Sequence, residues 1–142
     1  MAIDKLLQKT INIKAPASKV WDALTNPAII KEWLFGTNVI TDWKTGSPIL
    51  FTGTWNGVDY KDKGTILQIE KERTLQYNYW SGFSGLPDVP ENYSTITFSL
   101  LPDNGDTHLS LMQKDFANEA MLEHSDKNWD ETLKLFKSIC EK

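Results

Sequence analysis

The sequence lacks the features that mark disulfide-rich, membrane-spanning and nucleic-acid-binding proteins. Cys140 is its single cysteine, so no internal disulfide can form and a secreted disulfide scaffold is excluded. No run of residues approaches the ~20 apolar residues of a membrane span. Charged residues at Asp4 and Lys5 fall where a signal peptide would need its apolar stretch. We therefore expect a cytoplasmic protein with no membrane span.

The sequence also lacks a large excess of positive or negative charge. The formal net charge is -4, and no segment gathers Lys and Arg, so the basic surface of a nucleic-acid-binding protein is missing. Hydrophobic residues make up 40% of the chain and charged residues 24%, which is ordinary globular usage. Chains of this length usually form one unit that buries roughly 68% of its unfolded surface. We expect a single domain over residues 1–142 and no nucleic-acid partner.

The residue patterns of common catalytic and metal sites are absent as well. His108 and His124 are the only histidines, and neither has Cys, Asp or Glu at metal-ligand spacing. Cys140 lies near the end of a predicted helix, where a thiol usually contributes to packing. The acidic residues, Asp62 and Glu70 among them, fall mainly in turns and on helix faces that we expect to be solvated. No glycine-rich phosphate loop occurs. The sequence thus predicts no catalytic residue, no metal site and no cofactor.

What the sequence does contain is a helical signal near each end. Residues 11–13 alternate as a half-buried strand does, and a helix follows over residues 15–25 with Pro16 in its first turn. Pro27 opens a second short helix that Gly36 stops. A long amphipathic helix over residues 118–141 carries one apolar stripe. Its length of ~36 Å is enough to cross a seven-stranded sheet ~29 Å wide.

The middle of the chain is predicted to form strands. Six segments have strand character, at residues 38–43, 48–55, 58–70, 74–80, 93–102 and 107–115. Turn residues separate most of them, and Asn56-Gly57 between apolar alternations is a strong hairpin signal. Neighbouring strands are therefore antiparallel. Residues 81–92, rich in Gly and Pro, form a long loop of a kind that is often functional.

Four groups of residues in this pattern resemble a known family. They are Ala15-Pro16-Ala17-x-x-Val20-Trp21-x-Ala23-Leu24-Thr25-x-Pro27 with Trp33-Leu34 after it, Gly64-x-Ile66-Leu67-x-Ile69, Leu75-x-Tyr77, and His124-x-x-x-x-Trp129-x-x-x-Leu133. From about residue 10 to residue 141 the chain resembles the START-like (SRPBCC) helix-grip superfamily, and within it the branch of activator of 90-kDa heat-shock-chaperone ATPase homologue-like proteins. Asn128 departs from the branch, which usually has glycine at this position.

The resemblance implies an α+β helix-grip fold, also known from birch-pollen-allergen-like proteins. In this fold a curved antiparallel sheet of about seven strands wraps around the long C-terminal helix, and two short helices follow the first strand. A hydrophobic cavity lies between sheet and helix. Superfamily members mostly bind lipids, sterols or other apolar molecules, and some are enzymes.

Strand alternation places aromatic and aliphatic side chains on the concave face of such a sheet. With two helix tryptophans, the predicted ligand-binding residues are Trp33, Phe51, Trp55, Leu67, Ile69, Tyr77, Tyr79, Phe98 and Trp129. Tyr77, Tyr79 and Gln113 are the candidate polar anchors, because ligand pockets combine apolar walls with a few polar groups. The same side chains would equally fill a solid core. A further group of apolar residues is expected around the mouth, where it forms either a lid or partner-binding rim, or the closed end of the core: Trp33, Phe35, Trp80, Phe83 and Leu86.

Three functions follow as hypotheses. The first is non-catalytic binding of a small hydrophobic ligand, lipid-like or aromatic. The second, which the family resemblance implies, is an interaction module that contacts a heat-shock chaperone. The third is an enzyme acting on an apolar substrate, for which His124, Glu70 and Asp115 are the remaining candidates. The alternation pattern leaves open whether the protein is a monomer or a homodimer.

Overall fold

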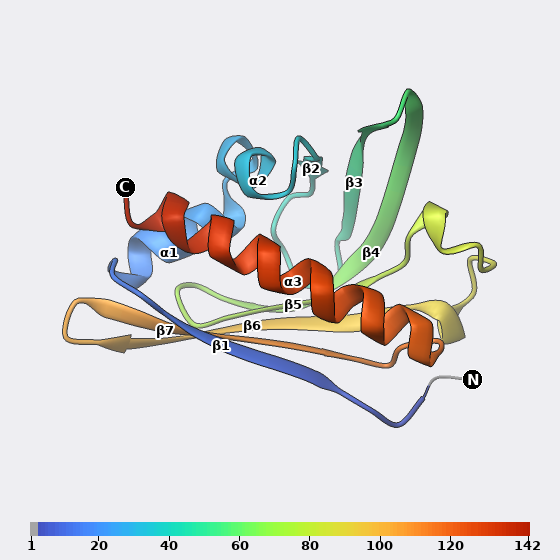
Figure 1. Cartoon of the computed structure of the whole chain (residues 1–142). Coiled ribbons are helices and arrows are strands. Elements are labelled where there is room, and N and C mark those ends of the chain that lie inside the picture. The colour runs from blue at the N-terminus through green and yellow to red at the C-terminus, as the bar shows by residue number, and fades with distance from the viewer. Residues whose placement is uncertain (1–2) are drawn as a thin grey trace.

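The computed structural model describes residues 3–142, which form one seven-stranded sheet and three helices (Figure 1). In chain order the elements are β1 (Leu7–Ile13), α1 (Ala17–Thr25), α2 (Pro27–Trp33), β2 (Asn38–Ile40), β3 (Pro48–Trp55), β4 (Val58–Glu70), β5 (Thr74–Tyr79), the 3-10 turns η1 (Gly82–Ser84) and η2 (Pro90–Asn92), β6 (Ser94–Asp103), β7 (Asp106–Lys114) and α3 (Glu119–Cys140). The strand order is β1-β7-β6-β5-β4-β3-β2, and every neighbouring pair is antiparallel. The predicted α+β helix-grip architecture is confirmed.

The helices begin where the sequence signals are strongest. The Asn26 side chain accepts a hydrogen bond from the Ala28 N–H at 3.0 Å, and Pro27 occupies the first turn of α2. Asn118 caps α3 in the same way by accepting from the Met121 N–H at 2.9 Å. Strand β2 is shorter than predicted, because Trp43 has a φ of +60° and the chain turns there.

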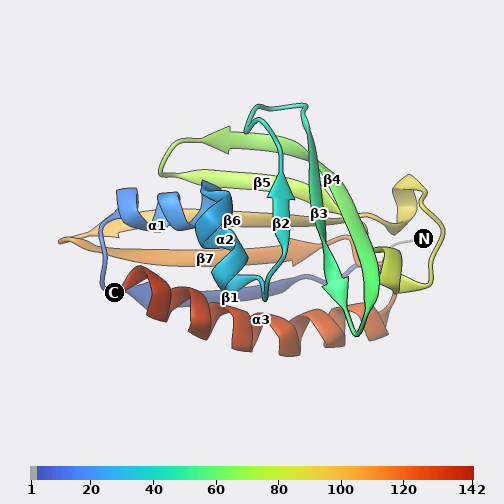
Figure 2. The same ribbon diagram turned by 90° about the horizontal axis from the view of Figure 1, so that it is seen from above.

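Helix α3 lies lengthwise beside β1 instead of crossing the sheet (Figure 2). Lys5 pairs with Glu119 near the start of both elements, and Lys9 pairs with Asp126 and Asp130 farther along. The helix is long enough to cross the sheet, but length alone does not determine its direction. Here the burial of Leu133, Phe136 and Cys140 and the ion pairs with the β1 region accompany a course along the strands.

The C-terminal end of α3 also covers the free edge of β1. The Lys137 ammonium donates to the Asn12 carbonyl at 2.6 Å, and the Glu141 carboxylate accepts from the Lys14 N–H at 2.8 Å. Both backbone groups belong to an edge that has no neighbouring strand. An unprotected edge invites pairing with another chain, and the helix blocks it here.

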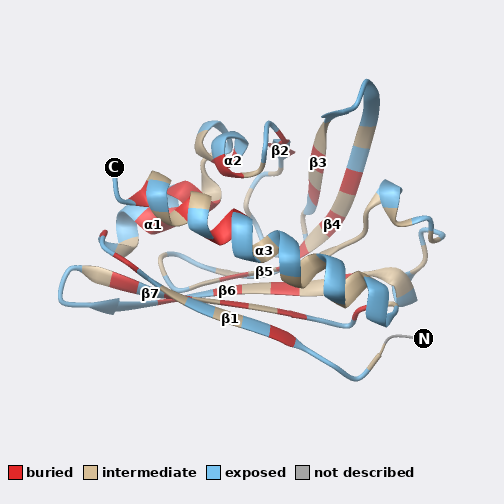
Figure 3. Cartoon of the chain, viewed as in Figure 1, coloured by how far each residue is buried: buried red, intermediate tan, exposed pale blue. Residues whose placement is uncertain are grey.

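The hydrophobic core is concentrated under the C-terminal half of α3 (Figure 3). Leu133, Phe136 and Cys140 are buried there, and Phe136 meets Trp33 edge to face with ring centroids 5.1 Å apart. By contrast, the described side chains of α3 before Thr132 are exposed or half-buried. One half of the helix thus rests on a solid core, and the other half bridges over the sheet.

The β3–β4 hairpin bends away from the sheet body (Figure 1). At the bend, a Cβ placed on Gly64 would lie 1.7 Å from the Asn78 carbonyl oxygen, so only glycine fits. Beyond the bend β4 pairs with β3 alone from Val58 to Asp62, whereas from Ile66 to Glu70 it pairs with β5. The bend opens space between the hairpin and the N-terminal half of α3.

Candidate functional site: a cavity between the sheet and helix α3

A cavity of about 390 Å³ lies beneath the N-terminal half of α3. Its floor comes from the inward face of β3, β4, β5, β6 and β7, its roof from α3, and its sides from the α2–β2 connection, the 81–92 loop and the segment before α3. The lining residues are Leu34, Thr37, Phe51, Asp62, Tyr77, Tyr79, Trp80, Ser81, Phe83, Ser84, Asn92, Ser94, Ile96, Gln113, Phe116, Ala117, Met121, His124, Ser125, Asn128, Trp129 and Thr132.

Aromatic rings form a continuous wall between this cavity and the solid core. Phe51 lies 5.6 Å from Tyr77 between ring centroids, and Tyr77 lies 6.4 Å from Phe98. Phe98 in turn meets Trp129 edge to face at 5.8 Å. These contacts hold the rings in fixed orientations, so the cavity has a stiff apolar side.

Gln113 joins the floor of the cavity to its roof. Its side-chain amide donates to the Ser94 hydroxyl at 2.9 Å, and its carbonyl oxygen accepts from the Trp129 indole N–H at 2.9 Å. Gln113 is buried, so both bonds are shielded from water. We expected this residue to be a free polar anchor, but its amide is already engaged in holding Trp129 over the cavity.

The Tyr77 hydroxyl has no hydrogen-bond partner among residues 3–142. Every polar side-chain atom that is sealed from solvent in this part of the chain does have a partner, so the Tyr77 oxygen must open onto the cavity. The side chain as a whole is only 5% exposed. Burial raises the pKa of Tyr77 well above its usual value, because the phenolate would lose its hydration. The group is a neutral O–H donor at physiological pH.

Asp62 is a buried carboxylate in the cavity lining. Its side-chain oxygens accept from the Tyr79 hydroxyl at 2.5 Å and from the Gly82 N–H at 3.1 Å. Burial, with the neighbouring Asp62 charge, raises the pKa of Tyr79 well above its usual value, so the hydroxyl keeps its proton. The expectation that Asp62 faces solvent is wrong: it is 7% exposed and ties the start of the 81–92 loop to β4.

Four of the nine predicted site residues line the cavity, namely Phe51, Tyr77, Tyr79 and Trp129. Trp33 and Phe98 lie in the solid core next to it, around a space of only about 10 Å³. Ile69 packs half-buried against the core and does not reach the cavity. Trp55 and Leu67 are 63% and 40% exposed, so the expectation that they face inward onto a ligand site is wrong.

Two local features explain these errors. A β-bulge between Ile66 and Gln68 adds one residue to β4, which shifts the alternation so that Leu67 faces out. Trp55 keeps the parity of Phe51, but it sits at the tip of the hairpin that bends away from the sheet. In β4 the alternate residues Ile66 and Gly64 are buried, and continuing that alternation two residues back would have placed Asp62 inward.

Residues around the mouth divide between the cavity and the surface. Trp80 and Phe83 line the cavity, and the Phe83 ring packs in a tilted arrangement against Tyr60, with ring centroids 5.7 Å apart. The Trp80 indole donates to the Leu86 carbonyl at 3.3 Å, which holds the loop in place. Phe35 is 63% exposed with a φ of +53° and lies outside the lining.

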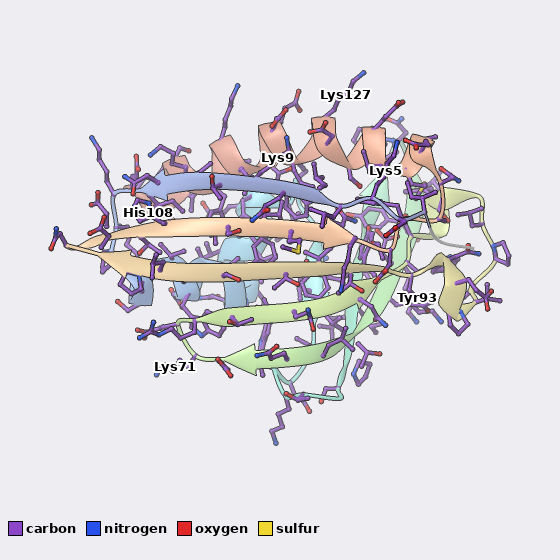
Figure 4. The ribbon with its side chains drawn as sticks, turned by 90° about the horizontal axis from the view of Figure 1, so that it is seen from below. Lys5, Lys9, Lys71, Tyr93, His108 and Lys127 are labelled. Atoms are coloured by element: carbon purple, nitrogen blue, oxygen red, sulfur yellow. The ribbon has the colours of Figure 1, made fainter. Side chains whose placement is uncertain are left out.

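The candidate chemical groups are mostly far from the cavity. Glu70 and Asp115 are exposed and do not line it, whereas His124 and Asn128 reach its mouth from exposed positions on α3. His108 lies on the outer face of the sheet, 3.0 Å from Asp103 (Figure 4). Within residues 3–142 no group of three or more metal-binding side chains is assembled. Burial raises the pKa of the Cys140 thiol to about 12, which is unsuited to a nucleophile.

A curved antiparallel sheet, a long C-terminal helix held along it and an internal cavity between them define a helix-grip domain of the START-like (SRPBCC) superfamily. The model of one family, described as activator of Hsp90 ATPase homolog 1-like protein, matches residues 14–141. The chain belongs to this family. In the part of the chain that the structure describes, no helix is both long and apolar enough to cross a membrane.

Solved structures agree with this assignment. The solution structure of ChR145 from Cytophaga hutchinsonii is 43% identical, with a TM-score of 0.84 over 99% of this chain and 97% of that one. MLL2253 from Mesorhizobium loti is 23% identical, with a TM-score of 0.78 over 95% and 96% of the two chains. The Aha1 dimer from Colwellia psychrerythraea is 18% identical, with a TM-score of 0.76 over 96% of each chain. No curated protein is a significant sequence match.

Proposed function

We propose that this protein binds a small hydrophobic molecule in the cavity beneath α3 and does not transform it chemically. The observation that carries the proposal is the cavity itself, whose volume of about 390 Å³ falls within the range of small-molecule sites. A solid core, the alternative that the sequence left open, occupies only the other half of the molecule. The aromatic wall supplies the apolar contact, and polar side chains border the rest of the cavity.

A neutral fluorescent dye such as Nile red tests this proposal. We expect saturable, one-to-one binding with a fluorescence increase, because the dye leaves water for an apolar site. Ser125→Trp should abolish it, since Ser125 is half-buried on α3 and its larger replacement would occupy the cavity. Lys127→Trp is the matched control, because Lys127 is exposed two residues further along the helix and lies outside the lining (Figure 4). Unsaturable binding, or equal binding by both variants, would refute the proposal.

A second function, contact with a heat-shock chaperone, is supported by family membership and by one surface feature. Phe35, Trp55 and Phe83 are 63%, 63% and 54% exposed, and aromatic side chains are enriched at protein interaction sites. The expected result is stimulation of the ATPase activity of a 90-kDa heat-shock chaperone, reduced by Phe35→Ser or Phe83→Ser. No stimulation by the unmodified protein would exclude this function while leaving ligand binding untouched.

A further inference from the structure

We infer that the ligand is a neutral molecule with a carbonyl or similar acceptor, which accepts a hydrogen bond from the Tyr77 hydroxyl at the floor of the cavity. This inference rests on the proposed ligand-binding function and adds the chemical class of the ligand. It comes from three features of the cavity: a hydroxyl without a partner, a lack of cationic side chains, and a surplus of O–H donors.

The first feature is the position of Tyr77. Its backbone is fixed in the middle of the sheet, opposite Ile96 on one side and Ile66 on the other. Its ring is held between Phe51 and Phe98, so the hydroxyl cannot swing toward another protein group. Because no group among residues 3–142 bonds to it, this hydroxyl can be satisfied only by water or by a molecule bound in the cavity. A ligand oxygen in the cavity would supply the missing partner.

The second feature is charge. Among residues 3–142, no Lys or Arg lines the cavity, and the one carboxylate in the lining, Asp62, already accepts hydrogen bonds from Tyr79 and Gly82. An anionic ligand such as a fatty acid would therefore bury its carboxylate without a cation and on the same cavity wall as a negative charge. His124 is the only imidazole in the lining, and it lies exposed at the mouth.

The third feature is the donor set. Thr132 in the roof is 4% exposed, and its hydroxyl has no hydrogen-bond partner among residues 3–142. The Ser94 oxygen accepts from Gln113, which leaves the Ser94 proton available. With Tyr77, these groups belong to a larger set of hydroxyls that border the cavity, which also includes Thr37, Ser81, Ser84 and Ser125. Each hydroxyl can both donate and accept, and a ligand carbonyl, which can only accept, would use these O–H groups as donors.

A pair of probes of nearly equal shape tests the inference. 2-Acetylnaphthalene and 2-ethylnaphthalene differ mainly in the carbonyl oxygen, and their affinities can be measured by displacement of Nile red. We expect the unmodified protein to bind the ketone about tenfold more tightly, which is the effect of one good hydrogen bond. Tyr77→Phe should reduce the ketone affinity to that of the hydrocarbon and leave the hydrocarbon affinity unchanged.

Tyr93→Phe is the control, because the Tyr93 hydroxyl bonds to Asp88 outside the lining (Figure 4). It should keep the preference for the ketone. Equal affinities for both probes in the unmodified protein would overturn the inference and leave the proposed function standing. If neither probe nor Nile red binds, the proposed function itself is overturned. Tighter binding of 2-naphthoate than of the ketone would also overturn the inference. Should Tyr77→Phe fail to fold, the probe pair on the unmodified protein decides.

Discussion

Asp62 shows how one side chain can shape the cavity through the segments that it joins. Its carboxylate links β4 to β5 through Tyr79 and to the 81–92 loop through Gly82. Hydrogen bonds to a charged acceptor are stronger than neutral ones, and here both are shielded from water. The loop that closes one side of the cavity therefore depends on a residue whose type alone suggests a solvated surface.

Asp62→Asn should loosen this loop while the sheet survives. The amide removes the charge and can turn an N–H group toward the Gly82 N–H, so we expect a loss of about 1–3 kcal/mol in the free energy of unfolding. Urea denaturation measures the loss, and faster hydrogen exchange of the Gly82 amide locates it. Asp59→Asn serves as the control, because Asp59 is exposed on the same strand and bonds only to Thr54. Equal losses for both variants would show that Asp62 has no special role.

At the scale of the elements, the bend in β4 determines where the cavity opens. Gly64→Ala would force a Cβ to within 1.7 Å of the Asn78 carbonyl oxygen. The backbone can relieve this clash only by separating β4 from β5. We expect a loss of at least about 3 kcal/mol, the range of the most damaging substitutions, measured by thermal and urea unfolding. Gly82→Ala is the matched control, since its Cβ would meet Lys61 at an ordinary 3.7 Å. An unchanged stability for Gly64→Ala would contradict the close approach.

The elements also show what a sequence can predict. Helix caps and turn residues act locally, which is why α3 was expected at residues 118–141 and runs from Glu119 to Cys140. The bulge in β4 depends on pairing with β5, and no residue type in the sequence indicates it. Leu67 was therefore predicted to point inward, whereas it points outward. The direction of α3 depends on contacts with β1 more than 110 residues away in the chain, as between Lys9 and Asp126. Local chemistry predicted the elements, and only the assembled sheet determined the cavity.

The cavity lining shows the same difference between what local sequence patterns predict and what only the assembled fold determines. Phe51, Tyr77, Tyr79 and Trp129 were expected in the lining because alternation and helix periodicity are strong in their elements. Phe98 follows the same alternation yet lies in the core, since the boundary between core and cavity depends on which half of α3 lies above. Ser94 and Thr132 were missed, because small hydroxyl residues are usually exposed and carry no periodic signal of their own.

The whole molecule combines a rigid half and a hollow half under one helix. Local stability follows apolar contact, so segments that rest on a core open less often than segments that span a cavity. Hydrogen exchange followed by mass spectrometry should therefore show faster exchange in α3 over residues 119–129 than over residues 132–140, where Leu133, Phe136 and Cys140 are buried.

Saturation with 2-acetylnaphthalene should slow exchange in the first segment and in residues 81–92, because the ligand stabilises only the state in which roof and floor are both in place. At a hundredfold excess over its Kd the gain is about 2.7 kcal/mol. The 2-ethylnaphthalene control should give a smaller effect with the same distribution. Uniform exchange along α3, or a ligand effect confined to the C-terminal half, would contradict the division of the molecule into core and cavity.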